Sequence, residues 1–99
     1  MITATIYNGR DNTLKLQLTS DDVVINHAAL TRVQMKVGTL LLDSAVTPSL
    51  FMIASDSVEI KLGQAGLVDG WYSGVLIAFD SQHTNGLVFG QYSITLVSV

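Results

Sequence analysis

The sequence predicts an all-β sandwich, and three observations lead to this fold class. Apolar and polar residues alternate with a period of two in several short runs, which is typical of strands with one buried face. Turn-forming residues recur at intervals of roughly 8–12 residues, as in small sandwiches. No run has the period of about 3.6 residues that marks an amphipathic helix. The 99 residues form one domain (1–99) large enough to bury its own core, and a small closed barrel is the nearest alternative fold.

The first half of the chain contains four expected strands. Turn formers at Asn8–Asn12 separate the first two, and the Asn-Gly pair there favours a positive φ. Gly38-Thr39 predicts a two-residue hairpin between the next two, with glycine in the first turn position. The expected strands are residues 2–7, 14–18, 32–37 and 40–43.

The second half contains four more expected strands. Val58, Ile60 and Leu62 share one face of an alternating run. Residues 63–70 are rich in glycine and predict a crossing loop with room for one helical turn, and the polar loop 81–86 separates the last two strands. The expected strands are residues 51–54, 58–62, 72–80 and 87–99.

A glycine and a tyrosine at the start of strand 72–80 make the fold prediction more specific. In immunoglobulin-like sandwiches, a tyrosine near the start of the sixth strand closes the preceding corner by hydrogen-bonding to upstream backbone. Gly70 and Tyr72 follow a glycine-punctuated crossing in the same way. We therefore expect an immunoglobulin-like antiparallel β-sandwich of about seven to nine strands, with Tyr72 and Gly70 in a structural tyrosine corner. Gly74 occupies the position of the antibody cysteine, so no disulfide accompanies the corner.

The strand that follows Tyr72 is apolar on both faces. If Tyr72 faces inward, so does every second residue after it, and the large apolar residues between them face outward. The last strand also places apolar side chains on its outer side. The candidate residues of a subunit interface are therefore Val75, Ile77, Phe79, Val97 and Val99. The alternative is that another strand, a loop or the second sheet of the same chain covers them.

The composition points toward association with other protein surfaces. Charged residues make up only 13% of the chain, about half of the usual share of roughly 25%. The mean hydropathy is +0.45, and a monomer with so few charges is hard to keep soluble. The net charge of −3 leaves no basic patch for nucleic acid. Apolar runs are no longer than Val75–Phe79, which is too short for a membrane helix, so we expect neither nucleic acid nor membrane as a partner.

Motifs that would specify a chemistry are absent or incomplete. The chain has no cysteine, and His27 and His83, each in an expected solvated loop, lack a second ligand at metal-binding spacing. In GWYSG (residues 70–74) the serine comes one position too late for a nucleophile elbow, and a strand follows instead of a helix. Residues 80–86 lack the alternating carboxylates of a calcium loop. We expect no catalytic, cofactor-binding or metal site, and no enzymatic activity.

Residues 29–44 and 58–99 carry a family resemblance. They contain Thr-Arg-Val leading to the Gly38 hairpin, a Leu-Gly…Gly-x-Tyr corner, Asp80 closing the tyrosine strand, and Gly-Leu-Val-Phe-Gly (86–90) before the last strand. In these features the chain resembles small immunoglobulin-like β-sandwich structural proteins of tailed bacteriophages, of the capsid-decoration, baseplate or fibre attachment-domain type. The resemblance implies a non-enzymatic building block repeated by the symmetry of a phage head or tail.

We therefore expect a structural component of a tailed-phage virion, acting as capsid decoration or as a tail, neck or baseplate accessory. Its partners would be other virion proteins, copies of itself, or both. Its place would be the virion, after synthesis in the host cytoplasm, because the first residues (MITATIYNGRD) lack the pattern of a secretory signal. The alternative is a recognition module in which Trp71 and the loop 81–86 bind carbohydrate or a host receptor. An enzyme would need a reaction that is lost on substitution of His27 or His83.

Overall fold

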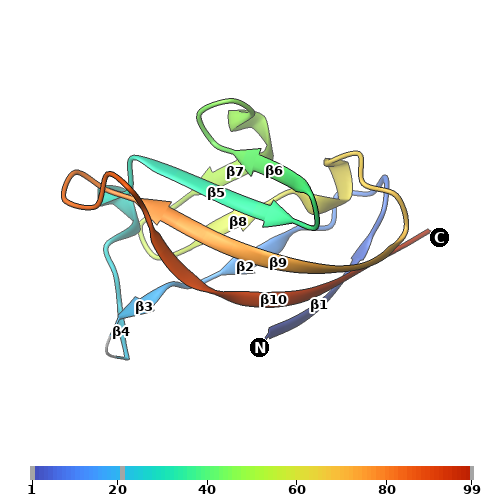
Figure 1. The fold of residues 1–99 in the computed structure, drawn as a ribbon, viewed down its shortest axis with the longest axis horizontal. Coiled ribbons are helices and arrows are strands. Elements are labelled where there is room, and N and C mark those ends of the chain that lie inside the picture. Colours follow the sequence, from blue (N-terminus) through green and yellow to red (C-terminus); the bar gives the residue numbers. More distant parts are fainter. Residues whose placement is uncertain (1, 21, 99) are drawn as a thin grey trace.

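Two β-sheets pack face to face in the computed structural model, which describes residues 2–20 and 22–98 (Figure 1). The all-β sandwich predicted from the alternation is confirmed. The five-stranded sheet has the order β1 (Ile2–Tyr7), β10 (Leu87–Val97), β9 (Gly70–Phe79), β5 (Arg32–Val37) and β6 (Leu40–Asp43). The three-stranded sheet has the order β2 (Leu14–Leu16), β8 (Val58–Ile60) and β7 (Phe51–Ile53).

The strand order is that of an immunoglobulin-like sandwich. In that fold, strands B, E and D share one sheet and strands C, F and G share the other. Here β2, β8 and β7 lie together in chain positions that match B, E and D, and β5, β9 and β10 match C, F and G. The remaining strands β6 and β1 lie at the two edges of the larger sheet.

One strand pair departs from the expected antiparallel arrangement. β1 pairs with β10 in parallel, with Ile2 opposite Tyr92 and Ile6 opposite Leu96. The turn formers at residues 8–12 do not fold β1 back onto a neighbour, because the chain leaves the larger sheet there and enters the smaller one as β2. A parallel pair needs a long connection, and the whole of the chain between β1 and β10 supplies it.

Short elements that the alternation did not predict lie between β2 and β5, and in the crossings. β3 (Thr19–Ser20) and β4 (Val23–Val24) form a small ribbon whose turn holds Asp22 at φ 63°. The described part of the chain therefore has ten strands, against the expected seven to nine. Two residues per strand are too few to show a period. The described residues also form three 3₁₀ turns: η1 (His27–Ala29), η2 (Pro48–Leu50) and η3 (Leu62–Gln64), of which η3 lies where a helical turn was expected.

The core lies between the sheets and follows the period of two. In β5, β9 and β10, alternate residues are buried: Val33, Met35, Val37, Leu76, Ala78, Tyr92, Ile94 and Leu96. The smaller sheet contributes Leu14, Leu16, Phe51, Val58 and Ile60 from the other side. Burying a large aliphatic side chain contributes roughly 1.5–3 kcal/mol, so these rows fix which face of each strand points inward.

One end of the sandwich is closed by a tight approach between η3 and the turn after β1. The Gly9 N–H donates to the carbonyl of Gly63 at 2.7 Å, and the Gly63 N–H donates to the carbonyl of Asn12 at 3.1 Å. A Cβ on Gly63 would lie 2.3 Å from the carbonyl oxygen of Arg10. Only glycine fits there, because the obstructing atom belongs to the backbone.

Candidate functional site

The tyrosine at the start of β9 makes the contact that the corner predicts. The Tyr72 hydroxyl donates a hydrogen bond to the carbonyl oxygen of Val68 at 2.7 Å. Its half-buried ring lies beside the β5–β6 hairpin, where a Cβ on Gly38 would be 3.0 Å from a ring carbon. Gly70 has φ +152°, a backbone conformation that other residues rarely adopt. The corner therefore holds the crossing loop to the sheet, and its role is structural.

A second set of contacts fixes the same crossing. The Asn8 side-chain amide donates to the Leu67 carbonyl and to Asp69, and the Ser98 hydroxyl donates to the other Asp69 oxygen. The hydrogen bond from Ser98, followed by that from Asn8, lowers the pKa of Asp69. These bonds join residues near the two ends of the chain to the crossing loop before β9, so they stabilise the domain itself.

The outward row of β9 is half-buried by the chain itself. Val75, Ile77 and Phe79 do face away from the core, as alternation predicts. A Cβ on Gly86 would lie 2.6 Å from Ile77 Cγ2 and 2.9 Å from a ring carbon of Phe79, so the β9–β10 loop folds back over both side chains. The Arg32 guanidinium also stands 5.2 Å from the Phe79 ring centroid, a cation–π distance. A role of this row in a subunit contact stays a prediction, and the chain already covers two of its three members.

The two candidate interface residues on the last strand are Val97 and Val99. Val97 is half-buried and lies opposite Tyr7 in the parallel pair. Val99 lies outside the described residues. Tyr92, Ile94 and Leu96, which share the other side of β10, are buried in the core.

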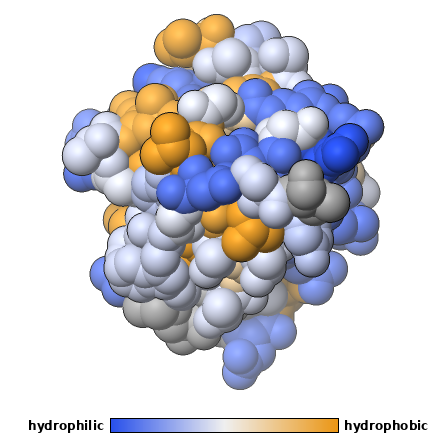
Figure 2. Space-filling view, turned by 90° about the vertical axis from the view of Figure 1, so that its right-hand side faces the viewer, coloured by the Kyte–Doolittle hydropathy of each residue, from blue (hydrophilic) through white to orange (hydrophobic). Residues whose placement is uncertain are grey.

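Exposed apolar residues also occur on the edge strands β6 and β7. β6 and β7 are edge strands of the two sheets, and a short connection joins them in the upper part of Figure 1. Leu41 is 50% exposed, Val46 78% and Met52 55%. We call the exposed large apolar residues of this segment, Leu40, Leu41, Val46, Met52 and Ile53, the β6–β7 flank. Figure 2, in which this part stays at the top, shows hydrophobic residues there beside hydrophilic ones.

The β6–β7 flank could not be predicted from alternation, for a physical reason. Leu40–Leu42 and Phe51–Ile53 are continuous apolar runs, so alternation does not tell which of their residues face outward. A different signal was present, because residues 40–53 contain a single charged side chain, Asp43. Edge strands of monomeric proteins usually carry charges that prevent pairing with another chain.

The one charge in this segment is neutralised within the sheet. Asp43 is buried and accepts hydrogen bonds from the Arg32 guanidinium, from Gln34 Nε2 at 2.9 Å and from the backbone N–H of Ala45 at 2.9 Å. The hydrogen bond from Arg32 is the largest influence on the Asp43 carboxyl and holds its pKa well below the usual range. Asp43 therefore anchors β6 to β5 and does not leave a free charge on the β6–β7 flank.

His27 is completely buried, whereas the sequence predicted that it lies in a solvated loop. Its Nε2 accepts from the backbone N–H of Leu18 at 3.0 Å, and its Nδ1 lies 2.9 Å from the carbonyl of Ile25. A neutral imidazole with the proton on Nδ1 satisfies both bonds. No residue pattern indicates this burial, because the hydrogen-bond partners are backbone groups. Both ring nitrogens are in use, so His27 joins the two sides of the β3–β4 ribbon and is not placed for catalysis.

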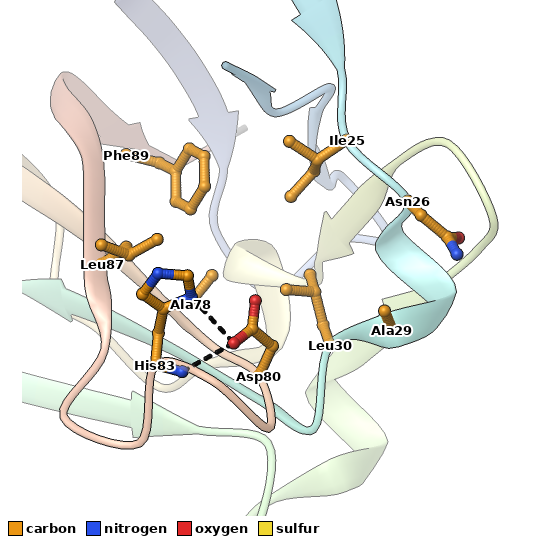
Figure 3. A pocket seen from close by; sticks show the side chains of 9 residues that line it. All are labelled: Ile25, Asn26, Ala29, Leu30, Ala78, Asp80, His83, Leu87 and Phe89. Carbon is orange, nitrogen blue, oxygen red and sulfur yellow. Dashed lines mark hydrogen bonds and ion pairs between the residues drawn. The ribbon is translucent and has the colours of Figure 1, made fainter.

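His83 lies at the mouth of a pocket of about 270 Å³ (Figure 3). Its Nδ1 lies 2.9 Å from Asp80 Oδ1, and both residues belong to the β9–β10 loop. The pocket lies between this loop and the segment around η1. Its lining is mainly apolar: Ile25, Ala29, Leu30, Ala78, Leu87 and Phe89, with Asn26, Asp80 and His83 as its polar members. A His–Asp pair orients a base for a nucleophile, yet this lining includes no Ser, Thr or Cys.

Trp71 is 63% exposed on the outer face of the larger sheet. Its indole N–H donates to the Ser93 hydroxyl on β10, which fixes the ring against the sheet. Thr95 lies opposite it in register, and Thr5 of β1 follows in the same row. An exposed aromatic ring beside hydroxyl groups is a surface on which a sugar ring can stack.

The structure also shows where the incomplete motifs lie. Ser73 of GWYSG lies inside β9, far from any strand-to-helix turn. Among the described residues, no group of three or more His, Cys, Asp or Glu side chains gathers as a metal site would require. The same part of the chain has no helix long and apolar enough to cross a membrane.

Comparison with known proteins does not add to this geometry. The chain matches no protein-family model, and comparison with curated proteins finds no relative.

Proposed function

We propose that this protein is a non-enzymatic structural component of a tailed-phage virion, which docks on neighbouring virion subunits as capsid decoration or as a tail, neck or baseplate accessory. The observation that carries the proposal is the β6–β7 flank. Two edge strands that follow each other along the chain expose large apolar side chains, and the single charge between them is held by Arg32. A surface of this kind favours burial against another protein.

Edge strands also supply a way of docking. Each has a row of backbone N–H and C=O groups that another strand can pair with, and β-strand addition uses these groups. β1, at the opposite edge of the larger sheet, has no charged residue either. The low share of charged residues, 13%, and the resemblance to phage β-sandwich proteins agree with a protein that works among other subunits. The partners would be other virion proteins or copies of this chain.

Mass spectrometry of particles purified from the lysate in which the chain is made tests the proposal. We expect the chain in the particles at a fixed copy number, which symmetry imposes. Hundreds of copies would indicate capsid decoration, and about a dozen or fewer would indicate the tail or neck. A chain that stays in the particle-free fraction at every purification step would contradict the proposal.

A second candidate function rests on Trp71. The exposed indole beside Ser93 and Thr95 favours a recognition module that binds carbohydrate. A glycan-array signal that is lost in Trp71→Ala and kept in Trp71→Phe would support it. Binding unaffected by Trp71→Ala, or no binding at all, would leave docking as the better account.

A further inference from the structure

The pocket at the β9–β10 loop combines an apolar interior with one oriented carboxylate. Asp80 Oδ1 accepts three hydrogen bonds: from the Gln82 N–H at 2.9 Å, from the His83 N–H at 2.7 Å and from His83 Nδ1 at 2.9 Å. These bonds fix the carboxylate, because two come from the backbone of its own turn. The pocket therefore has a polar group of defined direction at one side.

The second oxygen of Asp80 is turned toward the pocket. Asp80 Oδ2 accepts no hydrogen bond from any described residue, whereas Oδ1 takes three. Figure 3 shows the oxygen without dashed lines directed toward the space between Phe89, Ile25 and Leu30. A carboxylate oxygen is an acceptor only, so what it lacks is a donor.

The charged groups around the pocket favour a positively charged ligand. No Lys or Arg is among the residues that line it, and His83 is the one basic side chain of the lining, placed on Asp80 Oδ1 and not on Oδ2. Burial raises the pKa of Asp80, but the hydrogen bonds from His83 and Gln82 outweigh this and lower it, which keeps the carboxylate ionised. The Phe89 ring lies in the same lining and offers a π-face that attracts cations.

We propose that this pocket binds small organic ammonium ions, molecules with an apolar body and one protonated primary amine. The ammonium group donates to Asp80 Oδ2, and the body lies against Leu30, Leu87 and Phe89. A cavity of about 270 Å³ is near the lower limit for ligand sites, so the body is of the size of one aromatic ring. The proposal does not depend on a virion role, because it concerns the isolated chain.

Three probes with the same phenylethyl body and head groups of different charge test the proposal. The full chain, labelled with ¹⁵N, is titrated at pH 8 with 2-phenylethylamine, 2-phenylethanol and 3-phenylpropanoate while amide shifts are followed. We expect the amine to bind about tenfold more tightly than the alcohol, because its hydrogen bond to the carboxylate is charge-assisted. The carboxylate probe should bind more weakly than the alcohol. The shifts should be confined to residues 25–30, 78–83 and 87–89.

Asp80→Asn is the decisive variant, because the amide keeps an oxygen at the Oδ1 position for the turn and places an N–H₂ group toward the pocket. We expect it to keep the fold, to lose the preference for the amine over the alcohol and to bind the alcohol as before. Asp69→Asn is the matched control, since Asp69 lies just before β9 at the other end of the strand, and it should leave all three affinities unchanged.

Three results would overturn the proposal: equal affinity for the amine and the alcohol, an amine preference that persists in Asp80→Asn, or shifts that lie outside the pocket. If the spectrum of Asp80→Asn shows a disturbed fold, Asp80→Ser serves instead, because a serine hydroxyl can accept the hydrogen bonds of the turn and carries no charge. An amine preference that persists in this variant would also count against the proposal. None of these results bears on whether the chain is found in phage particles.

Discussion

Two apolar regions at the outside of the sandwich differ in what covers them. The outward row of β9, Val75, Ile77 and Phe79, lies in the middle of the larger sheet and is half-buried. The β6–β7 flank lies at the sheet edges, and Val46 there is 78% exposed. Both regions are apolar in sequence. The difference is that the first has neighbours on both sides and a loop that folds over it.

This comparison separates residues that a fold needs from residues that a partner could use. A central strand has cross-strand neighbours on both sides, and Ile77 has Gln34 and Val88 opposite it. An edge strand has a neighbour on one side only. Outward apolar residues on a central strand are therefore partly covered by their neighbours, whereas those on an edge strand have cover from one side only.

The largest expected effect comes from making the β9 row polar. In Val75→Thr/Ile77→Thr/Phe79→Ser, each half-buried side chain loses roughly half of the 1.5–3 kcal/mol for full burial, so we expect a loss of about 2–4 kcal/mol. Urea unfolding of the isolated domain measures it. Unchanged stability together with failed incorporation into particles would show that the row is an interface instead.

A smaller effect tests the loop that covers this row. Gly86→Ala places a Cβ 2.6 Å from Ile77 Cγ2 at a φ of +85°, and we expect a loss of about 2 kcal/mol from strain and overpacking together. Gly66→Ala is the matched control, because Gly66 has φ +77° but nothing within 4 Å of the added Cβ. Equal losses in the two variants would mean that the loop does not press on Ile77 and Phe79.

The ion pair beside the β6–β7 flank should give a pH-dependent effect. The pKa of Asp43 is lower in the folded chain than the value of about 3.9 in an unfolded one. Its contribution to stability is therefore complete above about pH 5 and is lost as pH falls below 4 toward the folded pKa. We expect Asp43→Asn to be less stable than the unmodified chain at pH 7, with the difference shrinking between pH 4 and pH 2.

Chemical denaturation across this pH range gives the difference directly, because Asp69 and Asp80 contribute equally in both proteins and cancel. A difference that stays constant from pH 7 to pH 2 would show that the Arg32–Asp43 pair does not stabilise the edge.

The smallest effect on stability is expected at the β6–β7 flank. Leu41→Thr/Val46→Thr/Met52→Thr removes exposed apolar groups, so the free energy of unfolding should change by no more than about 0.5 kcal/mol. Incorporation into particles should fall strongly, as measured by the copy number in mass spectrometry. A large loss of stability would place these residues in the core, and normal incorporation would remove them from the contact.

Most of the fold could be predicted from the sequence because apolar and polar residues alternate along its strands. Met35 and Leu76, for example, belong to rows of every second residue that were expected to face inward, and both are buried. The parallel pairing of β1 could not be predicted, since alternation defines the faces of a strand and not its partner. The β3–β4 ribbon was missed because Thr19–Ser20 and Val23–Val24 are too short to show a period.

Less of the candidate site could be predicted. The corner bond of Tyr72 follows from a local spacing, so the sequence contains it. The cover over Ile77 and Phe79 depends on where Gly86 lies in three dimensions, and the burial of His27 depends on backbone groups of Leu18 and Ile25. Contacts of these kinds have no residue pattern, so only the folded chain reveals them.

Hydrogen–deuterium exchange of the free and the particle-bound chain tests the central claim most directly. Docking at the β6–β7 flank would pair or cover edge-strand amides that face solvent in the free domain. We predict slower exchange in residues 40–53 on assembly and little change in residues 75–79. Unchanged exchange in residues 40–53 with new protection elsewhere would contradict the claim.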